Sequence, residues 1–243
     1  MTHVVSEASL QRAARFAGLA YLLIIVTSLS AVILIEQRLV VPGDVVATIS
    51  NILGNEFLYR FGTAYDLVMF ASVVALSVAL HVVLRTVSRG LALLALLWRL
   101  GEAFAGVITV LAGLIIGQLL SGGAHSTALE TGQVRALVEL LLGVRSAGLD
   151  ILTVFLCLGT IVFCYLFFRS RYIPRALSVW GMLAFLLMLV VTFVGILVPS
   201  FPSMIQTISV IPVALFEVAI GLWLLIRGVS VREGTADRIL GSA

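Results

Sequence analysis

Residues 91–120 read LALLALLWRLGEAFAGVITVLAGLIIGQLL, and this stretch decides the fold class. It is longer than the ~20 residues that an α-helix needs to cross the hydrocarbon core of a bilayer. Arg99 and Glu102, one helical turn apart, are its only charged residues. A charged pair inside such a segment is costly unless each charge has a partner, and it is a candidate functional site by default. The stretch therefore predicts a membrane-spanning helix with a charged pair inside it.

The composition of the whole chain supports the same interpretation. Hydrophobic residues make up 61% of the 243 residues and charged residues 11%, whereas soluble domains carry roughly 25% charged residues. A chain this apolar cannot cover a surface that faces water, so we expect an all-α, polytopic membrane helical bundle. Its length suits a single domain over residues 1–243, with the lipid bilayer as its partner.

The chemistry-bearing residues exclude several functions. All fifteen basic residues are arginine, which excludes a retinal-type Schiff base and a P-loop ATPase because both need a lysine. The net charge of +3 does not indicate a nucleic-acid partner, since the arginines cluster in loops as membrane topology requires. His81 is alone within a span, which argues against bis-His haem, and no spacing is typical of zinc. We therefore predict no cofactor and no metal, and we assign no catalytic residue.

Six apolar segments are near or above the length of a membrane span. They cover residues 16–35, 61–84, 91–120, 149–168, 177–198 and 209–226. On one side of these spans lie Arg12, Arg15, Arg85, Arg89, Arg169, Arg171, Arg175, Arg227, Arg232 and Arg238. On the other side lie Arg38, Arg60, Arg135 and Arg145. By the positive-inside rule, we expect both termini to be cytoplasmic.

Two connections on the outer side have the pattern of amphipathic helices. Pro42-Gly43-Asp44 predicts a turn with a helix N-cap, and residues 45–57 then place apolar side chains on one helical face. Residues 127–142 have a similar face. That second segment is either another interfacial helix or an extension of the span that follows it. We therefore expect six spans with one or two outer interfacial helices.

An internal repeat is one explanation of a recurring spacing. Asp66 and Asp150 stand 84 residues apart, and so do Arg85 and Arg169. In each case the aspartate opens a span and the arginine closes it. The spacing predicts a tandem hairpin repeat with its axis along the membrane normal, and chance similarity between apolar segments is the alternative.

Helix rise places the intramembrane charges at two depths, because each residue advances the helix by 1.5 Å. The inner layer, near the midplane, holds the candidate ligand- or proton-binding residues Arg99, Glu102, Glu217 and Trp98. The outer layer holds the polar residues Arg60, Asp66, Arg145 and Asp150.

Two interpretations fit these layers. In the first, the charges are ion pairs that lock helices together: Arg99 pairs with Glu217 and Glu102, and the two outer arginines pair with the two aspartates. In the second, the inner layer lines a polar cavity. One arginine facing two carboxylates leaves one negative charge in excess, which a proton or a cationic ligand would neutralise.

These interpretations lead to three functional hypotheses. The first is a membrane protein that binds a small ligand or couples transport to protons through Arg99, Glu102 and Glu217. The second is a non-catalytic scaffold or accessory subunit whose charges are structural. The third is an intramembrane enzyme for a lipid-like substrate, with Asp66 and Asp150 as acid and base. The pattern favours a protein that is not an enzyme, and it does not predict the oligomeric state.

The chain resembles the uncharacterised bacterial membrane-protein family known as domain of unknown function (DUF) 4386. The resemblance covers nearly the whole chain. It rests on an ordered set: Arg15-Phe16-Ala17-Gly18, Tyr21, Pro42-Gly43-Asp44, Asn51-Ile52-Leu53, Arg60, Asp66, Arg99, Glu102, Phe168-Arg169-Ser170, Ile173-Pro174-Arg175, Glu217, Trp223 and Gly228. It departs at Arg145, where the family often has a histidine. The resemblance implies a six- to seven-helix protein of the bacterial cytoplasmic membrane and supplies no activity.

Overall fold

All regular secondary structure in the described part of the chain is helical. The computed structural model describes residues 7–121, 130–198 and 200–230. Six helical segments in these residues are long and apolar enough to cross a membrane. They contain α1 (Glu7–Ala31), α4 (Glu56–Leu84), α5 (Arg89–Leu120), α6 (Thr131–Ser170), α7 (Arg175–Leu197) and α8 (Ser203–Ile226). The predicted all-α bundle with six spans is confirmed.

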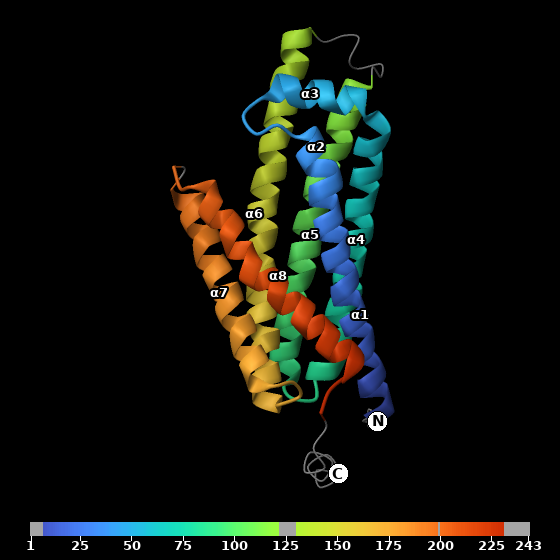
Figure 1. The fold of residues 1–243 in the computed structure, drawn as a ribbon, viewed down its shortest axis with the longest axis vertical. Coiled ribbons are helices and arrows are strands. Elements are labelled where there is room, and N and C mark those ends of the chain that lie inside the picture. Colours follow the sequence, from blue (N-terminus) through green and yellow to red (C-terminus); the bar gives the residue numbers. More distant parts are fainter. Residues whose placement is uncertain (1–6, 122–129, 199, 231–243) are drawn as a thin grey trace.

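The long helices form a closed ring in which each packs against two others. The order around the ring is α1, α4, α5, α6, α7 and α8, and α8 closes it by packing against α1. Figure 1 shows α8 running obliquely across the bundle, from α7 to α1. Gly18 allows this closure, because a Cβ atom there would lie 2.7 Å from the carbonyl oxygen of Gly221 on α8. The first and last spans are therefore neighbours in backbone contact.

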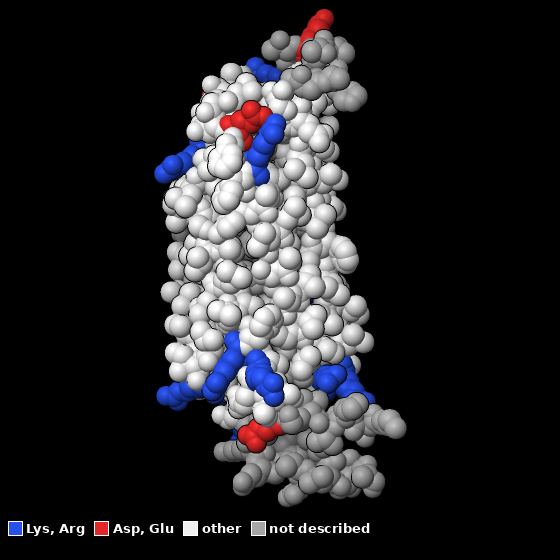
Figure 2. Space-filling view, turned by 90° about the vertical axis from the view of Figure 1, so that its right-hand side faces the viewer, with Lys and Arg blue, Asp and Glu red and all other residues white. Residues whose placement is uncertain are grey.

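Both described ends of the chain lie at one end of the bundle. The amide of Val229 donates to Gln11 Oε1 at 3.1 Å, and Gln11 Nε2 donates back to the Val229 carbonyl at 2.5 Å. Figure 2 shows arginines gathered near both ends, with an uncharged surface between them. Large apolar side chains are exposed on the long helices, including Phe104 of α5 at 71% and Leu183 of α7 at 61%. A lipid-facing band explains this exposure, since water would penalise it.

One predicted outer helix is present and covers the end of the bundle opposite the termini. This is α3 (Val45–Gly54), whose N-cap Asp44 accepts a hydrogen bond from the Ala47 amide at 2.9 Å. Ile52 of α3 is buried in an apolar cluster with Leu39, Tyr59, Ile116 and Val138. Figure 1 shows α3 lying across the bundle axis. Phe57, predicted on the same face, instead belongs to α4 and is exposed.

The second predicted outer segment is an extension of a span. Residues 127–129 lie outside the described residues, but from Thr131 the chain continues without a break to Ser170 as the 40-residue helix α6. At 1.5 Å per residue this helix is about 60 Å long, roughly twice the hydrocarbon thickness. Its buried Val138 packs in the cluster beneath α3, and this contact favours one continuous helix over a separate one.

The first span ends in an irregular turn that its apolar pattern did not predict. After Ala31 the backbone widens into the π-helical turn Val32–Glu36 and then returns to the short helix α2 (Gln37–Leu39). Such turns are rare and recur at functional sites. This one brings Glu36 to the lining of a cavity described below. The tandem hairpin repeat stays a prediction.

Candidate functional site

The predicted inner charges lie on α5 and α8 and interact electrostatically. Arg99 and Glu102 project from α5, and their Nη1 and Oε2 atoms are 2.6 Å apart. Both residues are almost fully buried, with 3% and 4% of their surfaces exposed. Neither atom of this contact has a hydrogen bond of good geometry among the described residues. The interaction is therefore mainly the Coulomb attraction of an ion pair that is buried away from solvent.

A glycine on the neighbouring helix makes room for the arginine. A Cβ atom at Gly159 of α6 would lie 2.8 Å from Arg99 Cγ and 3.1 Å from the Ala95 carbonyl oxygen. The apolar stem of Arg99 thus lies directly against the α6 backbone. Trp98 occupies a different place, with its ring 5.6 Å from the Phe155 ring of α6.

Glu217 and Tyr21 complete the inner cluster, which we define as Tyr21, Arg99, Glu102 and Glu217. Glu217 projects from α8 and interacts electrostatically with Arg99, and Glu102 interacts with both. Tyr21 of α1 is 3% exposed and interacts with all three charges. Among the described residues, Glu217 has no cation within 4.0 Å and is only partly buried. Two carboxylates thus share the field of one guanidinium, and only Glu102 touches it.

Two of the four predicted outer residues come together. Arg145 of α6 donates from Nη2 to Asp66 Oδ2 of α4 at 3.3 Å, and both side chains are partly buried. Gly113 of α5 leaves space for the guanidinium, since a Cβ atom there would lie 3.1 Å from Arg145 Nη1. The Tyr59 hydroxyl donates to the Gly113 carbonyl oxygen at 2.8 Å. The Arg145–Asp66 pair and the Tyr59–Gly113 hydrogen bond together link α4, α5 and α6 beneath α3.

The other two predicted outer residues lie apart from this contact. Arg60 pairs with Glu56 one turn earlier on α4, at 2.6 Å, and its side chain is 63% exposed. Asp150 has no ion pair within the described ranges. The expected pairing of two arginines with two aspartates therefore reduces to one pair, Arg145 with Asp66.

A small cavity, the outer pocket, adjoins the Arg145–Asp66 pair. Its volume is about 60 Å³, several times the ~10–15 Å³ that one water molecule requires. The residues that line it are Ala31, Ile35, Glu36, Leu39, Val40, Ile52, Tyr59, Gly62, Thr63, Asp66, Leu142 and Arg145. Glu36 interacts electrostatically with Asp66. The outer pocket therefore has the same charge composition as the inner cluster, two carboxylates and one guanidinium.

Sequence reasoning missed Tyr21, Glu36 and Tyr59. The two tyrosines sit within or beside apolar runs, where a tyrosine is ordinarily a packing residue. Glu36 immediately follows the predicted span 16–35; it ends the π-helical turn and lines the cavity. Within the described residues, no group of three or more His, Cys, Asp and Glu side chains is placed to hold a metal ion.

The sequence profile of the family described as Domain of unknown function (DUF4386) matches residues 16–228, most of the chain. The chain belongs to this family. The matched region of this DUF4386 member contains every residue of the inner cluster and the outer pocket. Comparison with curated proteins and with solved structures found no match to the chain.

Proposed function

We propose that this integral membrane protein binds a proton, or a small cation in its place, at the inner cluster and couples this binding to transport. The observation that carries the proposal is the charge count. Glu102 and Glu217 together carry two negative charges against the single positive charge of Arg99. An uncompensated charge at this depth is expensive. A bound proton or cation neutralises it.

Three observations support Glu217 as the residue that carries the surplus charge. Glu102 is held by Arg99 at 2.6 Å and is sealed from solvent. Glu217 has no cation within 4.0 Å in the described region and remains partly accessible. The groups that face it are Arg99 and Glu102 from α5, Tyr21 from α1, and Cys157 and Cys164 from α6. Glu217 is therefore the proposed carrier, and Arg99 and Glu102 are positioning residues.

Infrared difference spectroscopy of the purified protein tests proton binding, because a protonated carboxyl group has a C=O band that a carboxylate lacks. Wild-type protein should show one carboxylic-acid C=O band that titrates with pH. Glu217→Gln and Glu102→Gln should each remove the band, because each leaves one carboxylate for one guanidinium. Glu56→Gln, at an exposed residue paired with Arg60, is the matched control and should keep it. A band that persists in both inner variants would contradict the proposal.

Transport has a separate test. Proteoliposomes that contain a pH-sensitive dye should show proton flux with wild-type protein and with Glu56→Gln, and none with Glu217→Gln. A titrating band without any flux would keep the proton site and remove the coupling to transport.

We further propose that the end of the bundle carrying both described chain ends faces the cytoplasm of a bacterium. Eight arginines of the described residues lie at that end: Arg12, Arg15, Arg85, Arg89, Arg169, Arg171, Arg175 and Arg227. Positive-inside topology supports this orientation. A green fluorescent protein fused after Ala243 should fluoresce, and an alkaline phosphatase fused there should be inactive. The reverse pair of results would invert the topology.

A second candidate function is a structural scaffold, favoured by the sealed Arg99–Glu102 contact. In that case Glu102→Gln and Glu217→Gln would change stability without removing any titrating band. The enzyme hypothesis has less support. The outer pocket is lined by Asp66 without Asp150, and its ~60 Å³ is well below the roughly 300–1,000 Å³ of small-molecule sites.

A further inference from the structure

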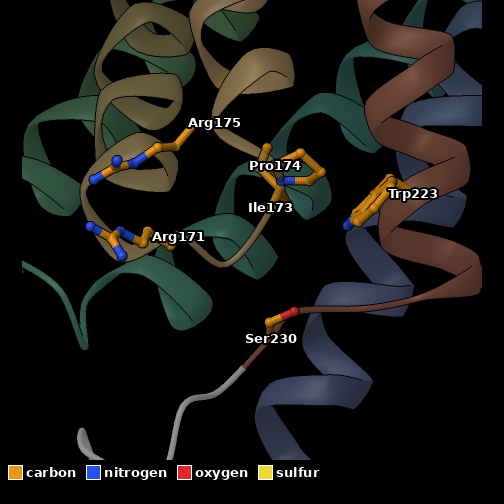
Figure 3. A pocket seen from close by; sticks show the side chains of 6 residues that line it. All are labelled: Arg171, Ile173, Pro174, Arg175, Trp223 and Ser230. Atoms are coloured by element: carbon orange, nitrogen blue, oxygen red, sulfur yellow. The ribbon is translucent and has the colours of Figure 1, made fainter.

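A second and larger concavity lies at the arginine-rich end of the bundle. This interfacial hollow has a volume of about 360 Å³ and is lined by Arg171, Ile173, Pro174, Arg175, Trp223 and Ser230. The volume is within the roughly 300–1,000 Å³ range of small-molecule sites. Figure 3 shows the two arginine side chains on one side of the α6–α7 turn and the Trp223 ring on the other. The hollow is far from the outer pocket, which lies beneath α3.

Within the described residues, the cations around the hollow have no carboxylate partner. In residues 7–121, 130–198 and 200–230, no carboxylate lies within 4.0 Å of Arg171, Arg175 or Arg227. Arg175 instead stacks over the Phe168 ring at 5.2 Å, and Arg227 stacks over the Trp223 ring at 4.8 Å. Stacking holds a guanidinium by its face and leaves its in-plane N–H groups free to donate. Phosphate oxygens match those donors in geometry and charge.

The backbone at the turn supports a role for the Arg171 side chain. Arg171 is the C-cap of α6 and has a φ angle of 58°, the left-handed conformation. Glycine adopts this conformation at no steric cost, whereas a residue with a Cβ atom is strained there. Among the described residues, Arg171 is the one non-glycine residue with a positive φ angle. A long cationic side chain is thus held at the rim of the hollow despite the strain.

The position of the hollow at the bilayer interface favours a lipid as the molecule that supplies the phosphate group. Trp223 and Arg227 lie at the end of a membrane-spanning helix, where tryptophan and arginine mark the bilayer interface. The helices beside the hollow expose apolar side chains to the hydrocarbon, including Leu183 of α7 and Leu222 of α8. A ligand here can place a phosphate against the arginines and acyl chains along α7 and α8. Basic pockets between membrane helices bind anionic lipid headgroups in this way.

We propose that the interfacial hollow binds the headgroup of an anionic phospholipid, through Arg171 and Arg175. The occupant is a lipid of the surrounding leaflet, and the site is independent of proton binding at the inner cluster.

Native mass spectrometry of the full-length protein, with phosphatidylglycerol and phosphatidylcholine added in parallel, tests the proposal. Wild-type protein should retain phosphatidylglycerol in preference to phosphatidylcholine. The double variant Arg171→Gly/Arg175→Gln should bind phosphatidylglycerol at least about tenfold more weakly, the loss expected for one charge-assisted contact or more. Glycine at position 171 removes the side chain without adding strain. The double variant Arg12→Gln/Arg15→Gln, at exposed arginines of the same end, is the matched control and should bind as wild type does.

Three results would overturn the proposal. The first is equal retention of the two lipids by wild-type protein. The second is wild-type retention of phosphatidylglycerol by the Arg171→Gly/Arg175→Gln variant. The third comes from an arm with inorganic phosphate alone: displacement of phosphatidylglycerol by millimolar phosphate would make the hollow a site for a free anion.

Discussion

Arg99 shows how a single residue can hold a charge at the centre of a membrane bundle. Its stem packs against Gly159 of α6, and its guanidinium touches Glu102 of its own helix. Because the pair lies within one helix, it does not by itself join two helices. The link to other elements comes from the field of Arg99 acting on Glu217 and Tyr21. This arrangement suits a positioning role better than a role as an interhelical lock.

Removal of one member of the pair should destabilise the fold strongly. Arg99→Ala leaves the buried Glu102 and the partly buried Glu217 without a cation, and loss of one partner of a buried pair costs about 3–5 kcal/mol. The double variant Arg99→Met/Glu102→Leu removes both charges and keeps the volume, so its free energy of unfolding should return to near the wild-type value. Reversible unfolding in mixed micelles measures both. Equal destabilisation by the single and double variants would contradict this account of the pair.

Helix rise predicts depth from residue number alone, and it groups Arg99, Glu102 and Glu217 in one layer. The charges of these three residues interact in the structure, but the rotation of each helix about its own axis could not be predicted from the sequence. Pairing across helices also depends on rotation, which apolar patterns fix weakly when a helix is apolar on every side. For this reason Arg145 meets Asp66, while Arg60 turns to Glu56 and Asp150 is left apart.

At the scale of elements, the outer end is built from pieces that interrupt regular helices. The π-helical turn Val32–Glu36 brings Glu36 to the outer pocket, and α3 covers it. The Pro42-Gly43-Asp44 motif predicted the start of α3, because a turn followed by an N-cap residue can be recognised from a few neighbouring residues. The sequence did not decide whether the segment before the fourth span is a separate interfacial helix or an extension of that span, since both structures bury the same apolar face. The structure has the extension, which begins at Thr131. The π-helical turn left no local signal, because its residues are apolar up to Glu36.

The cover over the outer pocket should depend on its N-cap. Asp44→Ala removes the acceptor for the Ala47 amide, and loss of an N-cap costs about 0.5–2 kcal/mol. Amide hydrogen exchange should therefore quicken in residues 45–54 and stay unchanged in α4. Asp44→Ser keeps a capping oxygen and should exchange as wild type does. Uniform acceleration along the chain would show that Asp44 supports the whole bundle and not α3 alone.

At the scale of the molecule, the ring closes where its first and last helices pack together. The proposed carrier Glu217 lies on α8, the helix that closes it. A Cβ atom at Gly18 would lie 2.7 Å from the Gly221 carbonyl oxygen and 2.9 Å from Leu225 Cα. Both are backbone atoms, so the helices must move apart to accommodate a side chain. The α1–α8 contact thus sets the distance between Glu217 and the rest of the inner cluster.

Gly18→Ala should therefore lower stability and disturb the inner cluster together. We expect a loss of about 1–3 kcal/mol in the free energy of unfolding, the usual cost of overpacking. The titrating carboxylic-acid band should shift in frequency, because Glu217 moves relative to Arg99 and Tyr21. Gly90→Ala is the matched control, since a Cβ atom there meets no atom within 4 Å, and it should leave the band in place. A destabilised Gly18→Ala protein with an unshifted band would show that ring closure and the charge cluster are independent, and Glu102 on α5 would then replace Glu217 as the candidate carrier.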